Sequence, residues 1–379
     1  MTGVSAPSPA PLTAGARPRL LLALSLALVP AFAATTAITQ GYKAEQRRLA
    51  SEWFERGGTA LDEGRPEEAI EAFRTALTFS REDRTFRLRL AQALAASGRT
   101  TEARAYLLSL RDAQPGNGPV NLELARLAAR SGNQDDAYRY YHASLEGAWS
   151  NAAEGQRRAI RLELARYLMA TGARLPAQSE LIVLAADLPP DRDFQRQVAG
   201  LMLRAGLAAR AQSLYEQILK ADPDDPAALA GAGRAAFESG TYIAAETLLT
   251  RATESGADLQ DVEPELSTLR RMSALDPYRR QLSLRARAER AAEALAIAET
   301  RLTRCRAAEA DAGLAALAVD IPRHRTGLTR PGTRDLNAVD EAMDLVFRIE
   351  QAVATLCGEP EGADRALLLL AVQRAGGAN

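Results

Sequence analysis

The sequence has few of the side chains that build catalytic and metal sites. Its 379 residues include two histidines, His142 and His324, and two cysteines, Cys305 and Cys357. Protein sites for zinc and iron draw mainly on these residue types, so little is left for a metal centre. The motifs typical of metalloproteases, serine hydrolases and phosphate-binding loops are also absent from the sequence. We therefore expect no enzyme, no metal, no cofactor and no small-molecule substrate.

An excess of either charge is missing as well. The chain carries 47 basic and 48 acidic side chains, which gives a formal net charge of −1. Nucleic acids and acidic membrane surfaces attract proteins with a basic excess. The balance therefore argues against a nucleic-acid partner.

Aromatic residues are scarce, at 5% of the sequence, and long runs of β-branched residues are lacking. These are the residues that favour strands, so a large β-sheet is not expected. Hydrophobic residues nevertheless make up 47% of the chain, which is enough for a folded core. The composition thus predicts an all-α protein.

Near the N-terminus, residues 20–42 contain no charged side chain. As a helix rising about 1.5 Å per residue, this segment is long enough to cross a hydrocarbon layer of about 30 Å. Arg17 and Arg19 precede it, and basic residues usually stay in the cytoplasm. We therefore expect a flexible lead-in over residues 1–19, a signal anchor over 20–42, and everything after Lys43 outside the cytoplasm.

A cleaved signal peptide is the alternative interpretation of the same segment. Its strongly apolar part, Leu20 to Val29, is short and is followed by Pro30. Residues 31–33 read Ala-Phe-Ala, a pattern of small residues that signal peptidases accept. Cleavage near residue 33 would release a secreted or periplasmic soluble protein, and both alternatives export the rest of the chain.

A repeat covers more than half of the sequence. Glycines recur with separations of 34, 34, 40, 34 and 34 residues, at Gly64, Gly98, Gly132, Gly172, Gly206 and Gly240. An alanine stands five residues after each glycine, and another alanine or glycine stands seven residues before it. Small side chains allow two helices to approach closely, and glycine suits a turn with positive φ between them. Each unit is therefore predicted to be a helical hairpin.

A large residue follows each alanine by four positions, on the same face of the second predicted helix. These residues are Phe73, Leu107, Tyr141, Leu181, Tyr215 and Leu249. In these columns the chain resembles the tetratricopeptide repeat (TPR) family, whose unit is a helix-turn-helix of 34 residues. The resemblance implies an all-α TPR solenoid of about six hairpins over residues 50–259.

One irregularity interrupts the repeats. Extra residues at about 152–157 separate the third unit from the fourth, shortly after Trp149. In a solenoid, such an insertion forms a loop or a longer helix on one side. We interpret it as a spacer, with a contact point for a partner as the alternative, and Trp149 as a packing residue.

Residues 264–379 follow the repeats and are predicted to be a C-terminal helical cap, because an open array leaves its last apolar face exposed. We expect an amphipathic helix from Tyr278 to about residue 308, a loop over residues 320–333 that includes His324, and helices at 336–356 and 364–374. Cys305 and Cys357 fall near the ends of two of these helices. In an exported domain we expect them to form a disulfide, with two unpaired buried thiols as the alternative.

Candidate binding residues come from the TPR resemblance, in which the first helix of each unit lines a concave groove. Six arginines fall in the columns expected to face this groove: Arg126, Arg130, Arg166, Arg196, Arg204 and Arg234. Guanidinium groups match carboxylates, so an acidic protein or peptide partner is expected there. The alternative is that the arginines are paired within the solenoid, as Glu123 and Arg126 could be at i, i+3 spacing.

The whole layout resembles membrane-tethered TPR proteins of bacterial envelopes. That resemblance implies a single-pass protein of the bacterial inner membrane, with its C-terminal domain periplasmic or extracellular. The expected function is that of a non-catalytic scaffold or adaptor that binds a protein or peptide partner in its groove. The alternative is an assembly or recruitment factor for envelope polysaccharide or outer-membrane biogenesis.

Overall fold

The computed structural model describes residues 16–149, 153–305, 311–330 and 335–376. Within these ranges the chain forms 17 α-helices and no β-strand. Two compact units can be distinguished, residues 1–160 and residues 161–379. The predicted all-α fold of TPR-like hairpins is confirmed, and each unit is described by itself below.

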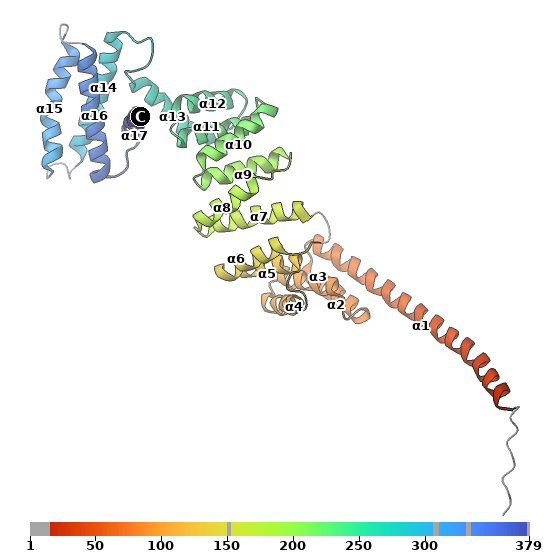
Figure 1. The fold of residues 1–379 in the computed structure, drawn as a ribbon. Coiled ribbons are helices and arrows are strands. Elements are labelled where there is room, and N and C mark those ends of the chain that lie inside the picture. Colours follow the sequence, from red (N-terminus) through yellow and green to blue (C-terminus); the bar gives the residue numbers. More distant parts are fainter. Residues whose placement is uncertain (1–15, 150–152, 306–310, 331–334, 377–379) are drawn as a thin grey trace, which may run out of the picture. The chain divides into compact units, whose positions relative to one another are not determined.

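Unit 1 contains one long helix and successive antiparallel hairpins (Figure 1). Its helices are α1 (Ala16–Asp62), α2 (Pro66–Phe79), α3 (Arg84–Ala96), α4 (Thr100–Ala113), α5 (Gly118–Arg130) and α6 (Gln134–Glu146). Helix α7 (Ala153–Ala170) begins in this unit and ends in the next.

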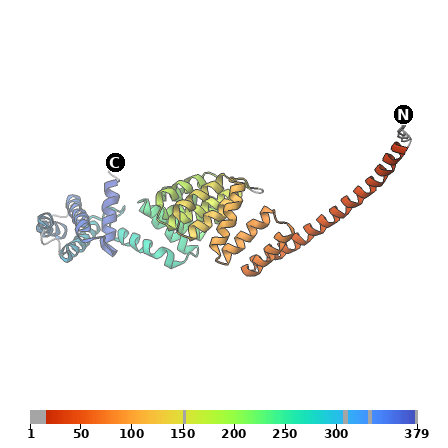
Figure 2. The ribbon, with the colours of Figure 1, turned by 90° about the horizontal axis from the view of Figure 1, so that it is seen from below.

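Unit 2 continues the hairpins and ends in a group of longer helices (Figure 2). The hairpin helices are α8 (Arg174–Ala185), α9 (Arg192–Arg204), α10 (Ala208–Ala221), α11 (Pro226–Glu238) and α12 (Tyr242–Glu254). The longer helices are α13 (Leu259–Leu275), α14 (Leu284–Arg304), α15 (Ala312–Thr329), α16 (Leu336–Cys357) and α17 (Gly362–Gly376).

The turn chemistry follows from the repeated residues. All six repeat glycines have φ between 73° and 84°, the left-handed region that glycine enters without steric cost. At the other end of the hairpins, Asp83, Asn117, Asp191 and Asp225 are N-caps of first helices, and each side chain accepts a bond from backbone N–H groups. Helix starts and stops are therefore encoded once per unit.

Packing inside each hairpin joins the small residue of the first helix to the large residue of the second. A Cβ built on Gly57 would lie 2.6 Å from Cε1 of Phe73. The same holds for Gly233, where it would lie 2.6 Å from Cγ of Leu249. The equivalent alanines, Ala91, Ala125, Ala165 and Ala199, are completely buried. The small column thus sets the distance between the paired helices.

Helix α1 merges the predicted anchor with the first helix of the first repeat. Its C-terminal end packs against α2, while its N-terminal part extends away from the hairpins of unit 1 (Figure 1). Of the lead-in expected over residues 1–19, residues 16–19 belong to α1, and residues 1–15 lie outside the described part of the chain, as do the side chains of residues 16–25 and 27. Among the residues that are described, no helix is long and apolar enough to cross a membrane.

Trp149 packs inside unit 1 just before the insertion. Its indole Nε1 donates a hydrogen bond of 3.0 Å to the Ser144 carbonyl. A Cβ on Gly118 would lie 2.3 Å from that same nitrogen, so the ring lies directly on the start of α5. Residues 150–152 fall outside the described ranges, and residues 153–157 belong to α7. Trp149 is therefore a packing residue.

Part of the C-terminal prediction was wrong. Residues 320–329 were expected in a loop but belong to α15, and His324 lies there partly buried, with Nδ1 3.9 Å from Glu341. Leu314, Leu317 and Ile321 form a buried helical stripe that the presence of Pro322 had obscured. The helix expected from Tyr278 also begins later, at Leu284, because Ser283 is its N-cap. Residues 331–334 lie outside the described part.

Helices α14 and α16 are joined covalently. Cys305 and Cys357 form a disulfide with a Cα–Cα distance of 5.9 Å, across a sequence separation of 52 residues. Closing a loop of that size restricts the unfolded chain and contributes about 4 kcal/mol in the chain-entropy model. The bond joins the C-terminal end of α14 to the C-terminal end of α16, just before the turn to α17.

A buried ion pair lies beside the disulfide. Arg301 on α14 pairs with the fully buried Glu350 on α16 and donates a second bond of 3.1 Å to the Gly358 carbonyl. Burial raises the pKa of the Glu350 carboxyl to about 7 even though Arg301 opposes the shift, and Asp364 raises it further. The carboxyl therefore holds a proton more strongly in the folded chain than in the unfolded one.

Two neighbouring glycines of α1 should respond oppositely to alanine. Gly57→Ala should destabilise the protein by about 1–3 kcal/mol, because its Cβ collides with the buried Phe73 ring. Gly58→Ala should stabilise it by about 0.5–1 kcal/mol, since a Cβ there meets nothing within 4 Å and the unfolded chain loses freedom. Urea unfolding followed by circular dichroism measures both, and equal effects would contradict this packing.

The buried Glu350 should make stability depend on pH. The folded pKa of the Glu350 carboxyl, about 7, lies above the ordinary value of 4.5. The protonated carboxyl therefore adds to the free energy of unfolding at low pH, and this stabilisation is lost as the pH rises from 4.5 to 7. Relative to Glu350→Gln, the wild type should lose on the order of 2–3 kcal/mol of unfolding free energy across that window. Parallel pH profiles of the two proteins in denaturant titrations would contradict this assignment.

Candidate functional site

The candidate site lies on the first helices of the repeats. Of the six predicted arginines, Arg126 and Arg130 lie on α5 in unit 1. The others lie in unit 2, with Arg166 on α7, Arg196 and Arg204 on α9, and Arg234 on α11. Each unit therefore carries its own set, and the two sets are described separately.

In unit 1, Arg126 takes part in a polar network between α3 and α5. Its guanidinium lies 3.1 Å from Glu123 Oε1, as the i, i+3 spacing indicated. The same carboxylate oxygen accepts a bond of 3.1 Å from Gln92 on α3. Glu123 is largely buried, so its charge depends on these partners. Arg130 lies exposed in the last turn of α5, where a cation complements the helix dipole.

In unit 2 the same kind of contact connects successive first helices. Arg166 donates a bond of 2.6 Å to Gln197 on α9. Arg234 on α11 lies 3.9 Å from Glu265 on α13. Both partners follow by 31 residues, as Glu123 follows Gln92 in unit 1. These arginines thus contribute to the spacing of the repeats.

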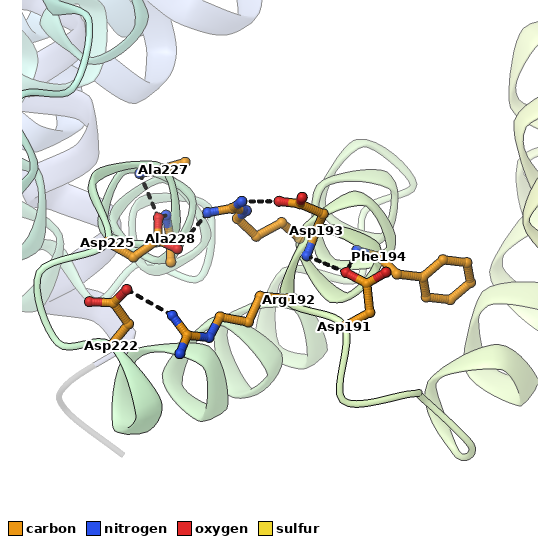
Figure 3. Close-up of polar contacts among 9 residues, drawn as sticks. Asp191, Arg192, Asp193, Phe194, Asp222, Asp225, Ala227 and Ala228 are labelled. Carbon is orange, nitrogen blue, oxygen red and sulfur yellow. Dashed lines mark hydrogen bonds and ion pairs between the residues drawn. The ribbon is translucent and has the colours of Figure 1, made fainter.

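Arg196 forms two ion pairs within unit 2. It pairs with Asp193 in its own helix and lies 2.6 Å from the buried Asp225 on the next first helix. Asp225 is also the N-cap of α11 and accepts bonds from the N–H groups of Ala227 and Ala228 (Figure 3). Its carboxylate is therefore satisfied by backbone and guanidinium together.

Arg192 adds a parallel connection one turn earlier on α9. Its guanidinium lies 2.9 Å from Asp222, just before the turn into α11, and the two residues face each other in Figure 3. Asp191, the N-cap of α9, binds the N–H groups of Asp193 and Phe194 in the same view. The start of α9 is consequently held by ion pairs and N-cap bonds together.

Tyr215 of α10 occupies a slot between α9 and α11. A Cβ on Gly231 would lie 2.2 Å from its Cζ, and one on Gly200 would lie 3.4 Å from its hydroxyl oxygen. Both glycines are on first helices, so the ring passes between them and carries its hydroxyl to the face where the arginines lie. The side chain is 6% exposed, and within the described residues its hydroxyl forms no hydrogen bond.

Positive charge gathers around this hydroxyl. Burial raises the pKa of Tyr215, and the charges of Arg234, Arg204 and Arg196 act in the opposite direction. Arg204 is exposed in the last turn of α9, with Nη1 3.8 Å from the Cβ position of Gly200. We call Tyr215, Arg204 and Arg234 the Tyr215 site.

Sequence reasoning missed several members of this surface. Tyr215 was interpreted only as the large packing residue of its unit, and the partners Gln197, Glu265 and Asp225 were not identified. A search for polar pairs 31 residues apart could have found the first two. Gly200 and Gly231, on consecutive first helices, were a further signal that a large ring lies between them.

The polar groups of this surface are mainly hydrogen-bond donors with positive charge. No group of three or more histidine, cysteine, aspartate or glutamate side chains in the described ranges could hold a metal ion. The Tyr215 hydroxyl and the guanidinium of Arg204 can both donate hydrogen bonds to an anionic oxygen. A carboxylate is therefore the kind of group that this geometry accepts.

Comparisons with solved structures return helical repeat proteins. YrrB, described as a TPR protein with an unusual peptide-binding site, is 16% identical, with 51% of this chain and 97% of that chain covered and a TM-score of 0.41. Part of a TPR repeat-containing protein from Cytophaga hutchinsonii is 12% identical, with 79% and 95% covered and a TM-score of 0.44. A tetratricopeptide repeat protein from Parabacteroides merdae is 13% identical, with 79% and 99% covered and a TM-score of 0.39.

Sequence comparisons identify the repeat directly. Among curated proteins, no match is found. The sequence model of the tetratricopeptide repeat matches residues 60–119 in unit 1 and residues 202–272 in unit 2. Each of the two units therefore contains a stretch that is similar to the tetratricopeptide repeat.

Proposed function

We propose that the chain is a non-catalytic adaptor that binds an acidic segment of a protein partner at the Tyr215 site. The observation that carries this proposal is the Tyr215 hydroxyl, which forms no hydrogen bond among the described residues and on which the charges of Arg234, Arg204 and Arg196 act. The ring is largely buried, but the hydroxyl oxygen is not among the fully buried atoms, so a ligand oxygen can reach it.

The distribution of ion pairs supports an acidic ligand. Arg196 is balanced by Asp193 and Asp225, and Arg234 has Glu265 at 3.9 Å. Arg204, in contrast, forms no ion pair within the described ranges. The guanidinium of Arg204 and the hydroxyl of Tyr215 therefore remain available to a partner. Together these two donors fit the two oxygens of a carboxylate.

Conservative substitutions test this binding. Tyr215→Phe keeps the ring between Gly200 and Gly231 and removes only the hydroxyl, while Arg204→Gln removes one exposed charge. The double variant should bind acidic peptides about 10- to 150-fold more weakly, since one hydrogen bond to a charged group contributes about 1.5–3 kcal/mol. Fluorescence anisotropy with labelled peptides selected on the wild type measures the change, and raised salt should weaken the wild-type complex.

A matched control separates the site from general charge. Arg210→Gln removes an exposed arginine from α10, at the surface of the same unit but outside the Tyr215 site. It should leave affinity unchanged. If Tyr215→Phe/Arg204→Gln and Arg210→Gln bind alike while both remain fully helical, the Tyr215 site is not the binding site.

We further propose that residues 20–42 anchor the adaptor in a membrane, with residues 43–379 on the far side from the cytoplasm. Large apolar side chains from residue 26 onward are exposed on α1: Leu26, Leu28, Val29, Phe32, Ile38 and Tyr42. The hydroxyls of Thr35, Thr36 and Thr39 donate to carbonyls one turn earlier in the same helix. Hydroxyls satisfied in this way are compatible with a bilayer.

Reporter fusions test the topology. Alkaline phosphatase fused after Ala50 should be active, because it folds only outside the cytoplasm, while β-galactosidase at the same position should be inactive. The opposite result would reject the anchor. Intact mass of the purified protein then distinguishes an uncleaved anchor that starts at Met1 from a soluble exported form that starts at Ala34.

A further inference from the structure

A cleft lies in unit 2 where the last repeat meets the C-terminal helices. It is bounded by α12, α13, the turn 276–283 and α17, and we call it the junction cleft. Its volume is about 530 Å³, within the range of sites that bind ligands. None of the residues of the Tyr215 site lines it.

The wall of the junction cleft combines an apolar part with polar and charged side chains. Leu269 and Met272 of α13 and Leu370 of α17 are buried side chains that line its apolar part. Ile243 of α12 also lines it, with 76% of its surface exposed. A large aliphatic side chain in water at a cleft provides area that a ligand can cover.

The acidic groups of the cleft already have partners. Glu246 accepts a bond of 2.9 Å from the Ser273 hydroxyl. Asp276 accepts one of 2.8 Å from the backbone N–H of Tyr278. Arg279 and Arg280 also line the cleft, and both are exposed. Glu246 and Asp276 keep their negative charges, because the groups that donate to them are neutral. In the described part of the chain neither guanidinium forms an ion pair or a hydrogen bond, so both arginines remain available to a carboxylate of a ligand.

The turn that carries these arginines is held in place. Arg290 donates bonds of 2.9 and 2.8 Å to the carbonyls of Ser273 and Asp276. Arg287 donates one of 2.9 Å to the Pro277 carbonyl. Gln281 has φ of 71°, a conformation that residues other than glycine adopt only where the surroundings enforce it.

Such a turn loses little freedom when a ligand binds. The backbone that carries Arg279 and Arg280 is already ordered by three side-chain bonds, so less conformational entropy opposes binding. Strained backbone of this kind is characteristic of ligand clamps, and here it lies directly at the edge of a cleft.

We propose that the junction cleft binds a short peptide segment of a partner protein, in which a large apolar side chain stands next to one or two carboxylates. The apolar side chain would enter between α13 and α17 and cover Ile243. The carboxylates would meet Arg279 and Arg280. This is a second interaction surface, independent of the Tyr215 site.

The test begins with peptides selected on the full-length protein. A phage-displayed library of random heptapeptides is enriched on the wild type, and the enriched peptides are synthesised and titrated by fluorescence anisotropy. One class should combine acidic residues with leucine, isoleucine or phenylalanine. For this class, Arg279→Ala/Arg280→Ala should weaken binding about threefold to thirtyfold, as expected for two partly exposed ion pairs. Ile243→Ser should also weaken it.

Matched variants control for surface effects. Leu175 of α8 holds the place equivalent to Ile243, three residues after the repeat glycine, and is 74% exposed. Leu175→Ser and Arg210→Ala should leave the affinity of this class unchanged, as should Tyr215→Phe. All the substituted side chains other than Tyr215 are exposed, so the fold should persist.

The outcomes are distinguishable from those of the Tyr215 site. If every enriched peptide loses affinity with Tyr215→Phe/Arg204→Gln but not with the junction variants, the proposal for the junction cleft is rejected and the proposal for the Tyr215 site is supported. If no enriched peptide is sensitive to Arg279→Ala/Arg280→Ala or Ile243→Ser, the junction cleft is not a peptide site. Purely acidic peptides that ignore Ile243→Ser would likewise contradict the proposed apolar anchor.

Discussion

The contact between a small residue on each first helix and a large residue on the second determines the rest of this architecture. Where Gly57 meets Phe73 and Gly233 meets Leu249, the paired helices lie too close for any larger side chain. A short turn joins each pair, and the repeat glycine takes the positive φ that ends the first helix there. The packing residues and the turn glycine together define one hairpin per unit.

The proposed binding surface lies on first helices, which also supply large core residues such as Leu94, Leu164 and Met202. Each first helix therefore packs one face into the core and displays polar side chains on its other face. There, structural and functional demands compete for the same arginines. Arg196 stabilises the N-cap of the next first helix, and Arg166 binds Gln197. At the Tyr215 site, the Tyr215 hydroxyl and the Arg204 guanidinium remain available, while neighbouring arginines are bonded to other residues of the chain.

The repeated hairpins could be predicted from the sequence because each depends on residues within about 16 positions of one another. Glycine, alanine and large residues at fixed spacing contain nearly all of that information. The partners of the arginines could not be predicted in the same way, because they depend on the offset between successive repeats. The helix α15 was missed for another reason: Pro322 and the surrounding polar residues suggested a loop, while burial of Leu314, Leu317 and Ile321 outweighs the lost hydrogen bond.

The constant spacing of the polar pairs between neighbouring repeats has an evolutionary consequence. Gln92 with Glu123, Arg166 with Gln197, and Arg234 with Glu265 are each 31 residues apart. Duplication or loss of a whole 34-residue unit would keep the two positions of such a pair opposite each other. The number of units can therefore change without moving these positions apart, while the side chains that meet there depend on which units become neighbours.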